Sequence, residues 1–501
     1  MLSKIFYPSR ILILGVSGAA GNLGRNIAAN LVEFGFGGEI HLYGRSGGNL
    51  FGHRIHTNLD DVPAGADLAV VLLPARAVPD ALEKLGETGV RHAVIETGGF
   101  AERGGEGGII QDRIKEIAER YGIRVVGPNC VGVMNPEAGL ATAFVFVRKM
   151  WRKGDVAVIA QSGGVGVSYL YLLASENIGI SKFASVGNKM NTDEKDYLEY
   201  LTGDPATKII VMYLESIARG REFFNLLRAT SKPVLIQKAN RTDAGKKIAF
   251  SHTAALSQDN EVVDAAIWQA GGIIVNSTKG MMSHIKSFLL PPANGDRIGI
   301  IARSGGHAVI SADSANENGF ALPEFDGGFL EKINSLLPAG IIKRQNPLDL
   351  GDLYNFEIYA KIMTEIIKLD YIDALVMVHE YFAMFEGEES RKLVPHAAAL
   401  SAEYRKPVYL VLFAEEEEIA AVKKKFTYPV FSSIEEAFQA ASARYRFEIA
   451  KINGGIEDER AQSYDREEVR GIIEGEKKRG AKLITLKGFE ILRNYSVKCP
   501  F

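Results

Sequence analysis

The sequence is poor in cysteine, in excess charge of either sign and in long hydrophobic runs. Only Cys130 and Cys499 occur among 501 residues, which excludes a disulfide scaffold and a cysteine-rich metal site. The formal net charge is −3, from 58 Lys and Arg against 61 Asp and Glu, so no basic surface indicates a nucleic-acid partner. The apolar run Ile11–Leu14 is far shorter than the ~7–15 residues of a signal-peptide core, and no run approaches the ~20 needed to span a membrane. We therefore expect a soluble, cytoplasmic protein without a membrane partner.

What is present is the composition of a well-packed globular protein, with 47% hydrophobic residues, 24% charged residues and 52 glycines. A length of 501 residues suggests about three domains. Short aliphatic runs alternate with amphipathic stretches, which predicts parallel sheets with crossover helices and an open-sheet domain over residues 1–145. The expected strands there are Ile11–Leu14, Leu68–Leu73, Ala93–Ile95 and Arg124–Val126, and the expected helices are Asn22–Phe34 and Pro79–Gly86.

The remainder contains an internal duplication. Three segments recur in the same order: DVAVIAQSGG (155–164) as RIGIIARSGG (297–306), IIVMYLE (209–215) as ALVMVHE (374–380), and KPVLIQ (232–237) as KPVYLV (406–411). Three matched strands in order predict two homologous α/β domains, over residues 146–291 and 292–450, joined near LPPANGD. Residues 451–501 are predicted to form a charged helical tail without a sheet of its own.

A glycine-rich segment, Gly15–Gly24 (GVSGAAGNLG), directly follows the first expected strand and opens a helix. Glycines let the backbone approach a phosphate, and a helix N-terminus presents free N–H groups to it. A site for NAD should also have Asp or Glu after the second strand, Glu39–Tyr43, whereas Gly44-Arg45-Ser46 follows there. This basic turn favours an extra phosphate on the ribose, as in NADP or CoA. The alternative is a tight turn with only a structural role.

Other turns stand where expected strands end. The turn Gly127–Cys130 (GPNC) is either a ligand-binding turn or a simple strand cap. The two Ser-Gly-Gly turns, Ser162–Gly164 and Ser304–Gly306, each lie at the carboxyl end of a strand where a helix begins, which is where open α/β sheets bind ligands. The first copy predicts an anion-binding turn. For the second copy, a purely structural turn is the preferred interpretation.

One histidine has an informative context. His252 lies in the loop SHTAA after the KPVLIQ strand, in the domain with the better Ser-Gly-Gly turn. The duplicated domain has no histidine at the corresponding place, where the acidic run Glu415–Glu418 is expected to form a loop instead. His252 is therefore not needed to fold this frame and is a candidate for chemistry. His307, which directly follows the second Ser-Gly-Gly turn, is the competing histidine.

Together these segments closely resemble the ADP-forming acyl-CoA synthetases, relatives of succinyl-CoA synthetase. The resemblance runs from about residue 8 to 450. It rests on GVSGAAG, GPNCVGVMNP, QSGGVG, SVGNKMNTDEKDYLEYLTGDP, YLES, ANRTDAGKKIAFSHTAAL and QNPLDL. It implies a Rossmann-like CoA-binding domain followed by two flavodoxin-like parallel-sheet domains, which agrees with the three units expected above.

The resemblance also implies an activity. The family converts acyl-CoA, ADP and phosphate to the acid, CoA and ATP, reversibly and with Mg²⁺. An acyl phosphate forms first, a histidine takes the phosphoryl group, and an ATP-grasp domain passes it to ADP. By this resemblance His252 is the phosphoryl acceptor, and Glu215 orients its imidazole. The turn Ser162-Gly163-Gly164 would bind the phosphoryl group.

The same resemblance assigns the CoA site. CoA would contact the glycine-rich turn, a basic residue after the second strand and two further turns, and its thioester end would lie near Asn129. The implied cofactor-binding residues are Gly15, Ser17, Gly18, Gly21, Arg45, Pro74, Thr97 and Gly98. No residue is assigned to a metal in this chain, since Mg²⁺ and ADP or ATP would bind the ATP-grasp domain.

The sequence departs from the family in three places. The turn after the second expected strand, which usually contains Asn-Pro in the family, reads Tyr43-Gly44-Arg45 here. Where the family usually has SHTG, Ser251–Ala254 reads SHTA, and no complete ATP-grasp domain is present, although the segment from Asp465 onward resembles its beginning. We therefore expect an ATP-grasp β subunit in a hetero-oligomer, or a fusion cut short. The alternatives are a non-catalytic CoA-binding relative, an NADP-dependent oxidoreductase and a mutase-like CoA enzyme.

Overall fold

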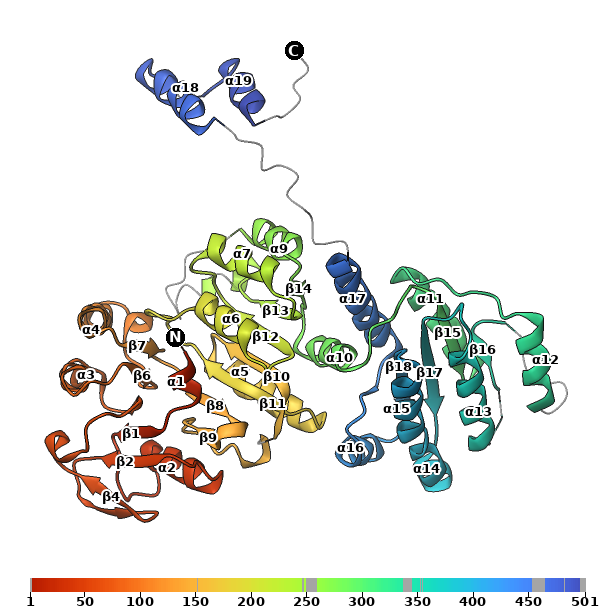
Figure 1. Ribbon diagram of the computed structural model, residues 1–501, viewed down its shortest axis with the longest axis horizontal. Coiled ribbons are helices and arrows are strands. Elements are labelled where there is room, and N and C mark those ends of the chain that lie inside the picture. The colour runs from red at the N-terminus through yellow and green to blue at the C-terminus, as the bar shows by residue number, and fades with distance from the viewer. Residues whose placement is uncertain are drawn as a thin grey trace. The chain divides into compact units, whose positions relative to one another are not determined.

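The computed structural model describes residues 2–150, 152–245, 247–248, 259–336, 345–351, 353, 355–452, 465–481 and 483–495. The chain divides into two compact units, residues 1–451 and 452–501. The first unit contains three sheets, which follow one another along the chain from red and orange through yellow and green to blue in Figure 1.

The first sheet is built from short aliphatic strands such as β5 (Leu68–Val71), all of whose residues are buried, as expected for a parallel sheet covered on both faces. Its strand order is β3-β4-β2-β1-β5-β6-β7, parallel except for the pair β3–β4. Helices α1 and α2 pack on one face, and α3 and α4 on the other. The remaining elements are β1 (Arg10–Leu14), β2 (Glu39–Tyr43), β3 (Gly48–Leu50), β4 (His53–His56), β6 (His92–Ile95), β7 (Arg124–Val126), α1 (Ser3–Phe6), α2 (Leu23–Glu33), α3 (Val78–Glu87), α4 (Glu106–Tyr121), η1 (Leu59–Asp61), η2 (Ala75–Ala77) and η3 (Ala101–Arg103).

The second sheet has the order β14-β13-β12-β10-β11-β8-β9. Strands β8 (Val133–Asn135) and β9 (Leu140–Ala141) join it as an antiparallel edge beside β11. The limit expected at residue 145 would therefore separate these strands from the sheet to which they belong. The other elements are β10 (Lys153–Ala160), β11 (Ile180–Ser185), β12 (Ile209–Leu214), β13 (Val234–Lys238), β14 (Ile273–Ile274), α5 (Gly163–Ser175), α6 (Glu194–Gly203), α7 (Gly220–Ala229), α9 (Asn260–Gln269), α10 (Thr278–Leu289), η4 (Pro136–Ala138) and η5 (Arg148–Met150).

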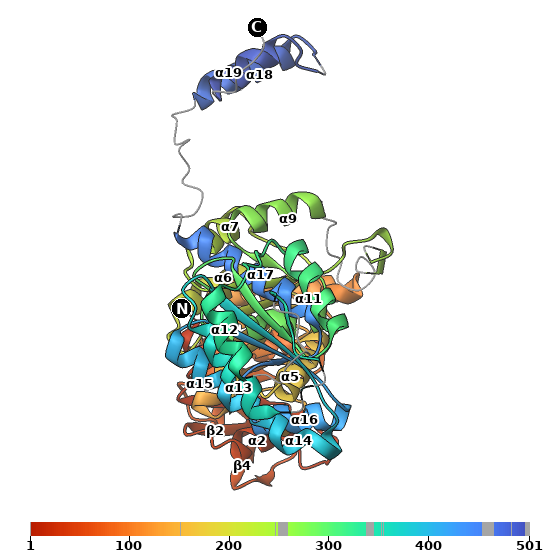
Figure 2. The same ribbon diagram turned by 90° about the vertical axis from the view of Figure 1, so that its right-hand side faces the viewer.

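The third sheet repeats the parallel part of the second. Its order, β16-β15-β17-β18-β19, matches β11-β10-β12-β13-β14, so the predicted duplication is confirmed strand by strand. Apolar side chains pack on both faces, with α11 and α17 on one face and α12, α13, α15 and α16 on the other, as Figure 2 helps to follow. The elements are β15 (Ile298–Ala302), β16 (Leu348–Asp349), β17 (Ala374–Glu380), β18 (Val408–Phe413), β19 (Val430–Phe431), α11 (Gly305–Glu317), α12 (Gly327–Leu336), α13 (Phe356–Ile367), α14 (Ala383–Arg391), α15 (Leu393–Tyr404), α16 (Glu416–Lys425) and α17 (Ile434–Ile452).

The acidic run Glu415–Glu418 does not form the expected loop. It begins helix α16, where carboxylates favour the positive end of the helix dipole. Glu418 is buried and accepts a hydrogen bond from the Nε of Arg391 at 2.8 Å. The run is therefore part of the packed frame of the third sheet.

The second compact unit contains helices α18 (Arg466–Lys478) and α19 (Lys487–Asn494), which agrees with the helical tail expected there. Asp465 caps α18 by accepting hydrogen bonds from the backbone N–H groups of Glu467 and Glu468. No helix in the described parts of the chain is long and apolar enough to cross a membrane.

Candidate functional site

The glycine-rich turn after β1 is held in one conformation by Asn22. The Asn22 side chain accepts hydrogen bonds from the backbone N–H groups of Ser17 at 3.1 Å and Arg25 at 2.8 Å, and it donates to the carbonyl of Gly15 at 2.9 Å. Gly15 has φ +97°, and a Cβ there would lie 2.2 Å from the carbonyl oxygen of Leu72, so this position requires glycine. The turn is thus fixed before any ligand binds.

Gly18 and Gly21 differ from Gly15. Both are exposed, and a Cβ at either position would have no neighbour within 4 Å. Nothing in the folded chain therefore requires glycine at these two positions. Glycine at these positions leaves the backbone open to a close approach by a ligand.

Two arginines stand beside this turn. Arg45, predicted from the sequence, is exposed directly after β2 and Gly44. Arg25, which sequence reasoning missed, donates a hydrogen bond to the carbonyl of Gly18 at 2.8 Å, and its guanidinium lies 5.3 Å from the ring centroid of Phe51. Its place in the first turn of the helix after the glycine-rich segment is the signal that could have found it. Both cations are suited to a phosphate group.

The ends of β5, β6 and β7 bring the other predicted cofactor residues to the same edge. The Thr97 hydroxyl donates to the carbonyl of Leu73 at 2.7 Å, and the Asn129 N–H donates to the carbonyl of Thr97 at 2.9 Å. A Cβ on Gly98 would lie 3.0 Å from the Asn129 Oδ1. Pro74 is exposed at the start of η2. Thr97, Gly98 and Asn129 therefore form one cluster.

Asn188, from the loop after β11, connects this cluster to the second sheet. Its N–H donates to the carbonyl of Pro128 at 2.9 Å, and its side-chain amide donates to Glu102 at 2.7 Å and to Gln111 at 2.8 Å. Burial opposes ionisation of Glu102, but hydrogen bonds from Asn188 and from two backbone N–H groups outweigh it and lower its pKa. The Asn129 turn is thus braced by a polar network from both domains.

A second carboxyl group at this edge has its pKa shifted in the opposite direction. Glu96, the residue after β6, is 5% exposed, and neither of its carboxyl oxygens has a hydrogen-bond partner among the described residues. Burial raises its pKa well above the ordinary value, which favours the neutral acid. Burial, and then the charge of Glu96, also raise the pKa of Cys130, so this thiol is not an activated nucleophile.

On the second sheet, the predicted anion-binding turn lies between β10 and α5. Ser162 caps α5, with its hydroxyl facing the backbone N–H of Val165, and Gly163 and Gly164 begin the helix. Gln161, directly before this turn, accepts hydrogen bonds from the N–H groups of Glu215 at 2.9 Å and Ser216 at 3.1 Å. One side chain therefore fixes the Ser162 turn relative to the Glu215 turn.

Two lysines that sequence reasoning missed hold the Glu215 turn from the other side. Lys238, the last residue of β13, donates to the carbonyl of Glu215 at 2.8 Å, and Lys189 donates to the carbonyl of Ser216 at 2.7 Å and to the carboxylate of Glu194 at 2.8 Å. Lys238 is only 4% exposed. Burial, and then the charges of Lys189 and Arg241, lower its pKa to about 8. The sequence signal that could have found Lys238 is a polar residue at the end of a strand of otherwise apolar residues.

His252 itself lies outside the described residues. The two ends of the segment that carries it are described, and they are tied together at the same edge of the sheet. Arg241 pairs with Asp264 through both ends of its guanidinium, and the Asn260 side chain donates to the carbonyl of Asn240 at 2.9 Å. Asn240 also donates to the carbonyl of Glu215 at 3.2 Å. The described residues on either side of this segment are thus linked to each other and to the backbone of Glu215.

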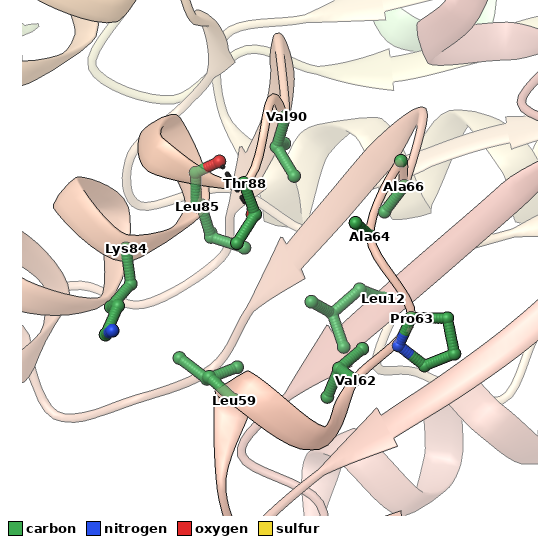
Figure 3. Close-up of a pocket in the computed structure, with 11 residues that line it drawn as sticks. Leu12, Leu59, Val62, Pro63, Ala64, Ala66, Lys84, Leu85, Thr88 and Val90 are labelled. Carbon is green, nitrogen blue, oxygen red and sulfur yellow. Dashed lines mark hydrogen bonds between the residues drawn. The ribbon is translucent and has the colours of Figure 1, made fainter.

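The described residues contain no group of three or more His, Cys, Asp or Glu side chains that could hold a metal ion. A small cavity of about 310 Å³ lies on the first sheet, away from the turns described above. Figure 3 shows its mainly aliphatic lining, including Leu12, Leu59 and Val90. Its lining residues precede β5 and β6 rather than follow them, so it faces the amino ends of the strands. None of the predicted site residues lines it.

Comparison with known proteins gives this arrangement a family. Residues 9–136 match the CoA binding domain, and residues 153–288 match the succinyl-CoA ligase like flavodoxin domain. The chain is 32% identical over 463 residues to the alpha subunit of ADP-forming acetate–CoA ligase II from Pyrococcus furiosus, which covers 91% of this chain and 100% of that one. The chain belongs to the family of ADP-forming acyl-CoA synthetases.

Two further relatives support and extend this. The dinucleotide-forming acetyl-coenzyme A synthetase 1 of Candidatus Korarchaeum cryptofilum, solved with phosphate and ADP, matches with a TM-score of 0.82 and 29% identity, covering 90% of this chain and 98% of that chain. The predicted fold class and ligase class are thereby confirmed. The ADP-forming 4-hydroxybutyrate–CoA ligase of Nitrosopumilus maritimus is 27% identical over 508 residues. The match covers 99% of this chain but 72% of that protein. Relatives are thus named for different acyl groups.

Proposed function

We propose that the chain is the CoA-binding and phosphohistidine subunit of an ADP-forming acyl-CoA synthetase. Its reaction converts acyl-CoA, ADP and phosphate to the acid, CoA and ATP, reversibly, through an acyl phosphate and phospho-His252. An ATP-grasp β subunit binds ADP or ATP with Mg²⁺, and the two subunits form a hetero-oligomer. The Pyrococcus relative, itself named as one subunit of a ligase, supports a partner of this kind.

The observation that carries the proposal is the convergence at the carboxyl edge of the second sheet. The Ser162 turn, the Glu215 turn and both ends of the His252 segment meet there, linked by Gln161, Lys238 and Asn240. Backbone N–H groups at the start of a helix suit a phosphoryl group, and buried cations compensate its charge. A carboxylate beside a histidine orients the imidazole and leaves one nitrogen as the nucleophile.

The proposed reaction has two steps on this chain. A phosphate oxygen attacks the thioester carbonyl near Asn129, the C–S bond breaks, and CoA leaves as the thiolate. A nitrogen of His252 then attacks the phosphorus of the acyl phosphate, the P–O bond breaks, and the carboxylate leaves. In this scheme Ser162, Gly163 and Gly164 bind the phosphoryl oxygens, and Glu215 holds the imidazole. The proposed substrate is a small acyl-CoA, and the reaction class does not specify which acyl group.

The test of the phosphohistidine is a labelling experiment with the complete enzyme. The chain is combined with its ATP-grasp subunit and Mg²⁺ with γ-labelled ATP, and acid-labile phosphate is measured. We expect label on His252 and its loss in H252N. The matched control is H284N, because His284 lies in α10 with its Nδ1 against the carbonyl of Gly280 at 2.8 Å. Full label in H252N contradicts the assignment.

The CoA site is tested by calorimetric titration with CoA, dephospho-CoA and NADPH. We expect CoA binding that weakens without the 3′-phosphate, no NADPH binding, and an affinity about tenfold lower in G18A, because the added methyl group blocks close approach to the turn. G37A is the matched control, since a Cβ at either glycine has no neighbour within 4 Å. Equal losses in both variants, or binding of NADPH alone, contradict the assigned site. CoA binding without label on His252 indicates the non-catalytic alternative.

A further inference from the structure

The third sheet carries a histidine at the position where the second sheet carries its anion-binding turn. Because the two sheets share their strand order, Ser304 after β15 corresponds to Ser162 after β10, and Glu380 at the end of β17 corresponds to Glu215 after β12. In the second sheet the histidine assigned to this chemistry lies in a separate segment. In the third sheet His307 lies within three residues of Ser304, in the first turn of α11.

His307 is held by three neighbours from three different elements. Its Nδ1 lies 3.0 Å from the hydroxyl oxygen of Ser304 and 3.8 Å from the Oε2 of Glu380. Its ring stacks on Phe413 of β18, with centroids 4.9 Å apart and planes within 3° of parallel. Its side chain is 20% exposed. The imidazole is therefore fixed in orientation but accessible.

These contacts determine which nitrogen is available. Glu380 carries negative charge and Ser304 can accept a hydrogen bond, so both favour the proton on Nδ1. The Nε2 of His307 makes no hydrogen bond to another residue in the described ranges, so its lone pair is free in this tautomer. A neutral imidazole held in this way is the nucleophilic form of histidine.

The other charged groups at this edge are engaged elsewhere. Arg303 donates two hydrogen bonds to the carboxylate of Glu386, at 3.0 and 2.7 Å. Asp349 accepts a hydrogen bond from the N–H of Gly351 at 3.0 Å. Glu380 is therefore the carboxylate that faces the imidazole.

We propose that His307 is a second phosphoryl-acceptor residue, oriented by Ser304 and Glu380. The inference rests on the proposed function for its phosphoryl donor, an acyl phosphate. The Nε2 lone pair of His307 attacks the phosphorus, the P–O bond to the acyl carboxylate breaks, and the carboxylate leaves with the electron pair. The Nδ1 proton stays on the resulting phosphoimidazolium, facing Ser304 and Glu380.

The experiment incubates the full chain with ³²P-labelled acetyl phosphate and Mg²⁺ and maps acid-labile phosphate by peptide mass spectrometry. The variants are H252N, H307N and the double variant. H396N is the matched control, because the Nε2 of His396 lies 2.9 Å from the carbonyl oxygen of Ala360 and no carboxylate of the described residues pairs with it. E380Q provides a readout of orientation, since it should slow labelling of His307 by roughly tenfold, below the ~10²–10⁴ of full acid–base catalysis, while labelling of His252 continues.

We expect label on both histidines in the wild type, on His307 alone in H252N, on His252 alone in H307N, and none in the double variant. Label that disappears in H252N but persists in H307N overturns the inference while leaving the proposed function intact. Label on His307 that never appears on His252 retains the inference and contradicts the proposed acceptor. A wild-type chain without label on either histidine overturns both.

Discussion

The second and third sheets share one strand order but are equipped differently at their carboxyl edges. Before the Ser-Gly-Gly turn, the second sheet has Gln161, which accepts the N–H groups of the Glu215 turn, whereas the third has Arg303, which donates to the carbonyl of Glu380. Near the carboxyl end of β13 the second sheet has the buried Lys238, and at the corresponding place in β18 the third sheet has the buried Leu412. The frame fixes where ligands reach the sheet, and a few side chains at the strand ends decide which chemistry follows.

Charge is the clearest difference between the two edges. Lys238 and the side chain of Lys189 are buried beside the Glu215 turn. Burial, and then the charges of Lys189 and Arg241, lower the pKa of Lys238 to about 8. In the third sheet Arg303 is paired with Glu386, and the corresponding lysine is absent because Leu412 stands there. The second edge therefore has a buried lysine that the third edge lacks, which supports the proposed anion site at the second edge.

The largest expected effect comes from removing that lysine. K238M removes a buried charge and the hydrogen bond to the carbonyl of Glu215, so we expect the rate of His252 phosphorylation by the complete enzyme to fall by about 100-fold, comparable to losing one donor of an oxyanion site. L412M, at the corresponding position of the third sheet, should leave this rate within about twofold. An equal loss in both variants would mean that the two edges do not differ in the way described.

A smaller effect is expected at a position that differs between β12 and β17. His379 of β17 stands where β12 has Leu214; it is 1% exposed, and burial and then the charge of Arg303 lower its pKa to about 3. The unfolded histidine, with a pKa of about 6.5, binds a proton that the folded one excludes, so stability is lost as the pH falls below about 6.5. H379L should remove this loss, which is about 2 kcal/mol between pH 7 and pH 5.

The measurement is chemical unfolding of the wild type and H379L at both pH values, with the pH-dependent difference compared between the two chains. H396N is the control, because the imidazole that it removes, that of His396, is only partly buried. If H379L and the wild type lose equal stability on acidification, His379 takes up its proton in the folded protein, and burial does not lower its pKa as described.

The sequence was sufficient for the elements and their duplication, because buried strands are short aliphatic runs and their repeat can be seen directly. It was also sufficient for the glycine-rich turn, since Gly15 and Asn22 act within one loop. It was not sufficient for the β8–β9 pair, which joins the sheet because β8 pairs with residues of β11 about 50 positions away. Such nonlocal pairs leave little local pattern.

The polar network at the second edge was missed for the same reason. Gln161, Lys189 and Lys238 are unremarkable singly, and only the fold brings them to the backbone of Glu215 and Ser216. Arg45 and His252 were candidates from the sequence itself, whereas their specific roles, and the assignment of Pro74, came from family resemblance. All three assignments remain predictions. Sequence alone predicts a loop for the acidic run after β18, because the pairing of Glu418 with Arg391 joins two separate helices.

The short pair β8–β9 has a consequence for dividing the chain. A cut at residue 145 would remove both strands and convert β11 into an edge strand, exposing unpaired N–H and C=O groups along Phe183 and Ala184. Such edges are templates for intermolecular pairing and aggregation. A separately produced second domain should therefore begin before Val133, so that the strand pair that protects its edge is retained.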